Sequence, residues 1–263
     1  KLKGDIMLYP KNEEPQLSDS LFQNPTSEYR GTPFWAWNTR LTTEKLHKQI
    51  EMLKTMGMGG FHMHVRTGMD SPYLDEEFMG YIQDCITKAK EENMLAWLYD
   101  EDRWPSGAAG GKVTAGKPEN ACKSLLFTTE PYTPDRPHKA QKPEPGRGRN
   151  SRRQDNGELL AVYDIVLNED GSLQKYHRIA TADPWFNDAP YVDTLNPDAI
   201  ADFIHITHDA YQKAIGDEFG KTVPAIFTDE PQFPKKGTLD FALEQKDVIL
   251  PWTRRLPALY EER

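Results

Sequence analysis

Short apolar runs alternate with amphipathic segments from Pro33 onward, a pattern typical of β/α units with a parallel sheet. Apolar and aromatic runs predict strands over 34–38, 61–65, 94–99 and 223–227. The first and second strands are each followed by a segment whose apolar residues recur at helical spacing, and the third is followed by a glycine-rich loop. A further helix is expected to begin at Asn196-Pro197-Asp198, where proline stands in the first turn. The sequence pattern therefore predicts one parallel sheet with four strands, each in its own β/α unit.

The helix after the first strand is predicted to be capped by Thr42 or Thr43 and to end at the glycines from Gly57 to Gly60. Asp75, or the turn before it, is expected to cap the next helix. The apolar positions of the two helices are Leu46, Ile50 and Leu53 in the first, and Phe78, Tyr81, Ile82, Cys85 and Ala89 in the second.

The alternation breaks after the third strand. Residues 124–129 and 159–166 have strand patterns, and 131–153 between them are rich in proline, lysine and arginine. The sequence at 168–171, Asn-Glu-Asp-Gly, predicts a hairpin turn into a third run that contains Leu173, Tyr176 and Ile179. This region is therefore expected to be a small β insertion with a mobile loop.

A closed (β/α) barrel needs eight units, and the residues after Pro231 are too few for four more. We expect an α/β fold, namely a partial or truncated TIM-type barrel with a small β insertion. It is either a fragment of a longer enzyme or an open half-barrel with protected sheet edges. The predicted parts are an N-terminal extension (1–32), the first part of the barrel (33–123), the β-rich insertion (124–182) and the continuation of the barrel (183–263).

Composition narrows the range of partners. A net charge of -9 and a pI near 5.3 argue against nucleic acid or an anionic membrane, which call for a basic surface. No apolar run approaches the roughly 20 residues of a membrane helix. The two cysteines, Cys85 and Cys122, lack metal-ligand spacing and indicate no disulfide scaffold. The N-terminus has no apolar signal core, but a mature form would lack one too, so the compartment stays open.

Reactive side chains cluster where the predicted strands end, which is where barrels carry their chemistry. Aromatic rings beside carboxylates suit a carbohydrate, because a pyranose offers apolar C–H faces for stacking and hydroxyls for hydrogen bonds. The candidate substrate-binding residues are Trp37, Asn38, His62, His64, Arg66, Asp100, Asp102, Trp104 and Asp229.

Glu230 is the candidate general acid. It follows the fourth strand in the sequence Phe-Thr-Asp-Glu-Pro, and Pro231 and Pro234 stiffen its loop. A group that protonates a glycosidic oxygen must be held within hydrogen-bond reach of that oxygen. The alternative is that Asp229 and Glu230 begin a solvated loop.

The acids after the third strand cannot all share one role, because adjacent residues of an extended strand point to opposite sides. Asp100 and Asp102 share a face, and Asp100 is predicted to bind substrate hydroxyls or a cation. Asp102 or Glu101 could instead pair with Arg103.

His62 and His64 form a His-x-His on one strand face, which also occurs in metal-dependent amidohydrolase barrels. Those enzymes need a lysine or histidines on later strands, whereas acids end the third and fourth strands here. Metal binding, sugar hydrogen bonding and a structural role all stay open for this pair. His205 and His208 on the last helix are expected to be exposed or packed.

Together these sequence motifs resemble the bacterial glycoside hydrolases related to family 106, the α-L-rhamnosidases. The motifs occur in order as Trp37-Asn38, the Gly57 to His64 run, Arg66-Thr67-Gly68, Leu98 to Asp102 with Trp104 to Gly107, and Phe227 to Pro231. The resemblance implies hydrolysis of plant-type or bacterial polysaccharide by an inverting two-carboxylate mechanism. It also allows a calcium ion near the sugar and favours a periplasmic or secreted location.

The resemblance further implies that the rest of the barrel, a β-sandwich and the second carboxylate lie beyond residue 263. The leading hypothesis is thus a glycosidase, or its N-terminal barrel portion, with Glu230 as acid and no predicted metal ligand. A non-catalytic carbohydrate-binding half-barrel and a metal-dependent hydrolase that uses His62 and His64 are the alternatives.

Overall fold

The computed structural model describes residues 15–16, 18–128, 158–164, 172–179, 186–187, 189–233, 236 and 248–262. The chain divides into two compact units. The first, called here the parallel-sheet unit, comprises Lys1–Ala109 and Ile204–Glu230, and the second, the antiparallel-sheet unit, comprises Gly110–Phe203 and Pro231–Arg263.

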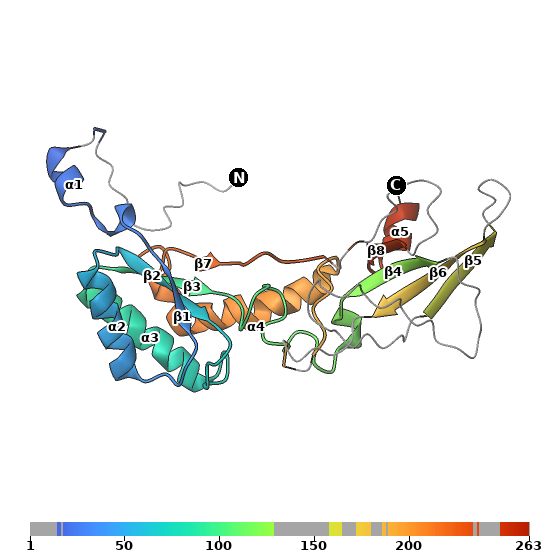
Figure 1. The fold of residues 1–263 in the computed structure, drawn as a ribbon, viewed down its shortest axis with the longest axis horizontal. Helices are drawn as coiled ribbons and strands as arrows, with labels where there is room; N and C mark the ends of the chain where they lie inside the picture. Colours follow the sequence, from blue (N-terminus) through green and yellow to red (C-terminus); the bar gives the residue numbers. More distant parts are fainter. Residues whose placement is uncertain are drawn as a thin grey trace, which may run out of the picture. The chain divides into compact units, whose positions relative to one another are not determined.

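The parallel-sheet unit contains a four-stranded sheet (Figure 1). Its strands are β1 (Phe34–Trp37), β2 (Gly60–Val65), β3 (Leu95–Tyr99) and β7 (Ile226–Phe227), paired in that order and all parallel. The helical segments of this unit are α1 (Asp19–Gln23), η1 (Ser27–Tyr29), α2 (Thr43–Thr55), α3 (Glu76–Glu91), η4 (Gly216–Glu218) and, from Ile204 onward, α4 (Pro197–Ile215). The predicted mixed α/β fold with a parallel sheet is confirmed. A closed barrel is not formed by the described residues.

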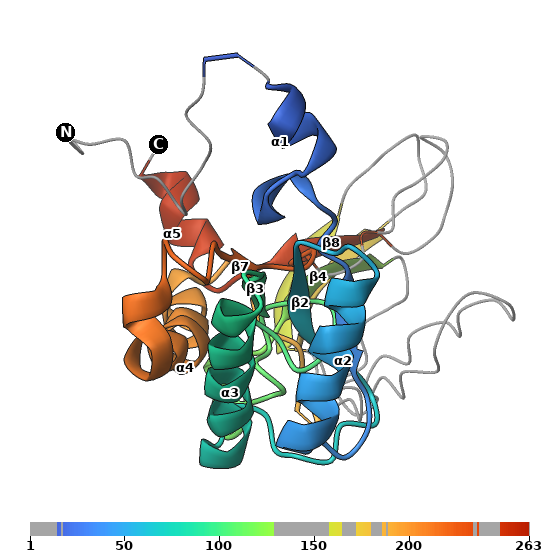
Figure 2. The same ribbon diagram turned by 90° about the vertical axis from the view of Figure 1, so that its left-hand side faces the viewer.

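The helices begin where their capping residues predict. Thr42 caps α2 by accepting a hydrogen bond from Lys45 N, and Asp75 caps α3 through Phe78 N at 2.7 Å. Helices α2 and α3 lie side by side against the sheet (Figure 2). Their buried stripes are Leu46, Ile50 and Leu53 on α2, and Phe78, Ile82, Cys85, Ile86 and Ala89 on α3.

The two faces of the parallel sheet differ, because side chains alternate along each strand. The face toward the helices carries a closely packed core that includes Trp35, Trp37, Phe61, Met63, Ala96 and Leu98. The other face, called here the aromatic face, carries rings in mutual contact, namely Phe34, His62, His64, Trp97, Tyr99 and Phe227.

The sheet curves toward its aromatic face. Phe34 and Phe227 stand on the two outer strands, three strand spacings apart, which is about 14 Å in a flat sheet. Their ring centroids are nevertheless only 4.9 Å apart. Two phenylalanine side chains cannot span that gap from a flat sheet, so the aromatic face is concave.

The antiparallel-sheet unit contains a second four-stranded sheet in the order β5-β6-β4-β8. Its strands are β4 (Lys123–Thr128), β5 (Glu158–Asp164), β6 (Ser172–Ile179) and β8 (Val248–Trp252), and neighbours are antiparallel. Two short helices, η2 (Pro118–Asn120) and α5 (Leu256–Glu261), complete the described elements of this unit.

The predicted strands of the insertion are present as β4, β5 and β6. The predicted loop at 131–153 and hairpin turn at 168–171 lie outside the described residues. Strand β8 was not predicted. It falls in the range assigned to the barrel continuation, 183–263, but pairs with β4 in the antiparallel sheet. Its five residues have no alternating pattern that would mark them as a strand.

Cys85 and Cys122 are both buried free thiols. Burial raises the pKa of Cys122 to about 12, so this thiol stays protonated and unreactive at neutral pH. Within the described part of the chain, no helix combines the length and apolar character that crossing a membrane requires.

Candidate active site

Strands β3 and β7 end next to each other, and the segments after them carry most of the predicted site. Tyr99 lies opposite Phe227 in the parallel register, and Asp100 N donates to Phe227 O at 3.2 Å. The segment 100–109 after β3 and the segment 228–230 after β7 therefore start from adjacent points at the carboxyl edge of the sheet.

Asp100 is a fully buried acceptor at this edge. Its Oδ1 accepts from Ser106 Oγ at 2.6 Å, and its Oδ2 accepts from Thr228 Oγ1 at 2.6 Å. His208 Nε2, from α4, lies 3.2 Å from the same Oδ2. A buried carboxylate needs such partners, and here they come from three separate segments. The predicted contact of Asp100 with substrate stays a prediction, while the structure assigns its oxygens to these three side chains.

Glu101 holds the glycine-rich segment that follows it. Its buried carboxylate accepts hydrogen bonds from four backbone N–H groups, those of Asp102 and of residues 107–109, at 2.7–3.0 Å. Asp102 pairs with Arg103, with Oδ2 2.9 Å from Nη2. The ion pair considered for this acidic run is thus made by Asp102, and Glu101 fixes the loop conformation.

Asp229 is held by both its backbone and its side chain. Its N–H donates to Ser106 Oγ and its carbonyl accepts from Ser106 N, each at 2.8 Å. The Tyr99 hydroxyl donates to Asp229 Oδ2 at 2.9 Å. Burial and the neighbouring Asp229 carboxylate raise the pKa of Tyr99, so its hydroxyl stays protonated and remains a donor.

Glu230 is exposed at this edge, and its Oε2 accepts a 3.1 Å hydrogen bond from Trp104 Nε1. Its backbone is left-handed, with φ of 45°. A non-glycine residue in this region is strained and persists only where its surroundings fix it. The structure thus brings the predicted Trp104, Asp229, Glu230 and Asp100 together through direct contacts between the two segments.

The two predicted histidines belong to the aromatic face. His62 Nδ1 lies 3.0 Å from Thr32 O, and the His64 ring centroid is 4.0 Å from that of Tyr99. Burial, together with the positive charges of Arg66 and His62, lowers the pKa of His64 to about 4. His64 is therefore neutral at physiological pH. Its buried Nε2 has no hydrogen-bond partner among the described residues.

The remaining predicted residues divide between core and surface. Trp37 lies on the helix-covered face, 1% exposed, with its ring 5.8 Å from Phe78. In this position its indole cannot stack on a sugar. Asn38 and Arg66 are exposed at the carboxyl ends of β1 and β2, where a substrate could reach them.

Ser106, Thr228 and His208 were missed as site residues. Ser106 stands within the motif Trp104 to Gly107, but nothing in the sequence shows that it contacts the aspartate six residues before it, and His208 was expected only to be exposed or packed. A weak signal did exist for Thr228, which stands at a strand end directly before Asp229.

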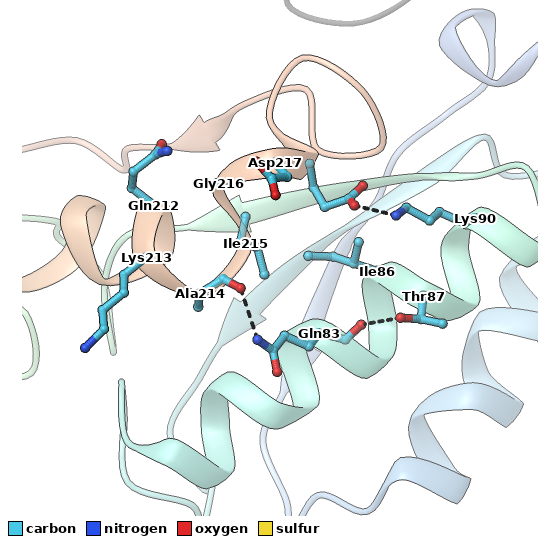
Figure 3. A pocket seen from close by; sticks show the side chains of 11 residues that line it. Gln83, Ile86, Thr87, Lys90, Gln212, Lys213, Ala214, Ile215, Gly216 and Asp217 are labelled. Atoms are coloured by element: carbon cyan, nitrogen blue, oxygen red, sulfur yellow. Dashed lines mark hydrogen bonds and ion pairs between the residues drawn. The ribbon is translucent and has the colours of Figure 1, made fainter.

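A separate cleft of about 400 Å³ lies between α3 and the end of α4 (Figure 3). Its walls include Gln83, which donates to Ala214 O at 3.0 Å, and Lys90, which pairs with Glu218. Lys90 precedes β3 and Glu218 precedes β7, so the cleft lies toward the amino ends of these strands. Among the residues that the structure describes, no aromatic side chain lines this cleft. It is therefore separate from the candidate active site.

Across the described residues, no group of three or more His, Cys, Asp or Glu side chains is arranged to hold a metal ion. The calcium ion that the resemblance allows stays an expectation.

No protein-family model matches the chain, and no curated protein matches it. Among solved structures, a rhamnosidase from Novosphingobium sp. PP1Y is similar at 21% identity and a TM-score of 0.32. The match covers 41% of this chain and 11% of the rhamnosidase chain. So weak a likeness assigns neither fold nor activity, and the functional argument rests on the site itself.

Proposed function

We propose that this chain is the first part of a (β/α) barrel of a glycoside hydrolase, with Glu230 as the general acid. The observation that carries the proposal is the exposed Glu230 carboxylate, held by the indole N–H of Trp104 at the carboxyl edge of a parallel sheet. In barrel enzymes this edge carries the catalytic groups.

Three features support the acid role. Glu230 has a strained left-handed backbone, and such strain clusters at functional sites. The preceding residue is fixed to Ser106 and Tyr99, so the carboxylate starts from a rigid point. The indole N–H of Trp104 donates to one carboxylate oxygen, Oε2, and so limits the movement of the Glu230 side chain.

The barrel assignment is supported by the curvature of the sheet. The wall of a (β/α) barrel consists of parallel strands in chain order, with helices on the outer face and a concave inner face. The sheet here has the same arrangement, and aromatic rings line its concave face. The order β1-β2-β3-β7 with consecutive neighbours continues naturally to further strands beyond β7.

The substrate class follows from the sequence motifs that resemble the α-L-rhamnosidases, together with the aromatic side chains beside the carboxylates. We infer a glycoside of plant-type or bacterial polysaccharide, with α-L-rhamnosides as the first candidates. Hydrolysis with inversion needs a second carboxylate about 6.5–9.5 Å from the acid, with water between them. We expect that residue outside the present chain.

The test is Glu230→Gln in the full gene product, assayed on a panel of phenyl glycosides that includes the α-L-rhamnoside. Loss of the acid should lower kcat by about 10²- to 10⁴-fold. Glu91→Gln is the control, because Glu91 is an exposed carboxylate at the end of α3. Normal turnover by Glu230→Gln would show that the assignment is wrong. Binding of the sugar without any turnover by the unmodified protein would favour the non-catalytic alternative.

A further inference from the structure

We infer that Ser106 is a positioning residue that sets the Glu230 carboxylate through the backbone of Asp229. This inference rests on the proposed function, because the group that it positions is the proposed acid. Ser106 is fully buried and contacts Asp100 and Asp229, so its effect on Glu230 passes through these neighbours.

Strand β7 is too short to fix the residues after it. Its ladder consists of Ile226 and Phe227 alone, paired with the end of β3. A segment that leaves a two-residue ladder has no sheet hydrogen bonds to define its course. Nevertheless, Glu230 is held in a strained backbone conformation three residues later.

Side-chain hydrogen bonds replace the missing ladder. Thr228 Oγ1 donates to Asp100, and Glu230 accepts from Trp104. Between them, Asp229 N donates to the Ser106 hydroxyl and Asp229 O accepts from Ser106 N. Every residue of 228–230 is therefore tied to the segment 100–106. We call this set of contacts the β3–β7 network.

Ser106 occupies the central position of the network. Its Oγ donates to Asp100 Oδ1 while accepting from Asp229 N, and its own N–H donates to Asp229 O. Asp100 is in turn fixed by Thr228 and His208. Loss of the Ser106 hydroxyl would leave Asp229 N without its acceptor and Asp100 without one donor. The adjacent Glu230 would then be free to leave its strained conformation.

The predicted effect has a chemical signature. A general acid matters for a poor leaving group and matters little for an activated one, which departs without a proton. Ser106→Ala should therefore impair hydrolysis of a phenyl glycoside and leave a dinitrophenyl glycoside of the same sugar nearly unaffected. A serine that only stabilised the fold would affect both substrates alike.

The experiment compares the unmodified full gene product with Ser106→Ala, Glu230→Gln and the double variant on both substrates, using the sugar that it turns over best. Misplacement of the acid should lower kcat of Ser106→Ala by about 10- to 100-fold on the phenyl glycoside, with KM unchanged. The double variant should be no slower than Glu230→Gln alone, because both changes act on one group.

Equal losses on the two substrates, or a multiplied loss in the double variant, would overturn the role of Ser106. If Ser106→Ala does not fold, Thr228→Val carries the same test, because Thr228 is exposed and valine keeps its shape. A substrate-independent effect of Thr228→Val would equally overturn the inference. Different results would contradict the proposed function itself. These are the absence of cleavage of any glycoside, or a Glu230→Gln variant that loses the same activity on the phenyl and the dinitrophenyl glycoside.

Discussion

The buried carboxylate of Glu101 offers the sharpest test of how the loop after β3 is held. Glu101→Ala removes the acceptor of four backbone N–H groups, those of Asp102 and of residues 107–109. Each buried N–H left without a partner costs about 1–3 kcal/mol, and partial entry of water offsets some of this cost. We expect the free energy of unfolding to fall by about 4 kcal/mol in total.

Glu101→Gln should cost less, about 2 kcal/mol. The amide keeps one oxygen, which can accept from the N–H groups of residues 107–109. Its NH₂ group then faces Asp102 N–H, so that two donors meet where the native structure has a donor and an acceptor. Glu101→Gln is therefore expected to be more stable than Glu101→Ala and less stable than the native protein.

The assay is urea unfolding, supported by amide hydrogen exchange of the peptide that spans residues 100–109. With a slope of about 2 kcal/mol per molar urea, Glu101→Ala should shift the midpoint by about 2 M. The exchange measurement assigns the loss to the parallel-sheet unit. Glu91→Gln is the matched control and should stay within about 0.5 kcal/mol of the native protein. A shift of less than about 0.5 M for Glu101→Ala would refute the role given to this carboxylate.

Two further predictions concern buried ionisable side chains. Burial lowers the pKa of His64 from 6.5 to about 4. Between these pH values the imidazole is therefore protonated in the unfolded chain and neutral in the native chain. Its contribution to stability is complete above pH 6.5 and is lost as pH falls toward 4. His64→Gln should therefore flatten the dependence of unfolding free energy on pH in this range, and an unchanged dependence would contradict the reasoning. Lys123 is buried, donates to Glu119 O and Ala121 O, and lies 3.7 Å from Asp193. Lys123→Met should cost about 3–5 kcal/mol, and adding Asp193→Asn should recover part of it; full stability of the single variant would contradict this.

The sequence was sufficient for the local elements of the parallel-sheet unit. Its strands, the caps of α2 and α3 and their buried stripes were predicted from side-chain period and capping chemistry, both of which act within a few residues. The cluster of Trp104, Asp229 and Glu230 could be predicted as well, because parallel strands bring their carboxyl ends to one edge.

The same reasoning was wrong where the exposure of a side chain depended on which face of the sheet the helices cover. Trp37 and Asn38 are neighbours at one strand end, and the sequence alone treated both as substrate-binding residues. The packing of α2 and α3 buries Trp37 at 1% exposure and leaves Asn38 in solvent. Strand β8 was missed for a related reason, since its pairing with β4 joins segments more than 120 positions apart.

The sequence by itself thus determined which short segments become strands and helices and which reactive side chains stand at their ends. Only the tertiary structure decided that Asp100 and Glu101 turn inward as acceptors, and that Ser106 joins Asp100 to Asp229. Hydrogen bonds between residues 106 and 229 leave no periodic trace in either segment. They depend on the curvature of the sheet and on the backbone course of two loops, which the whole fold sets.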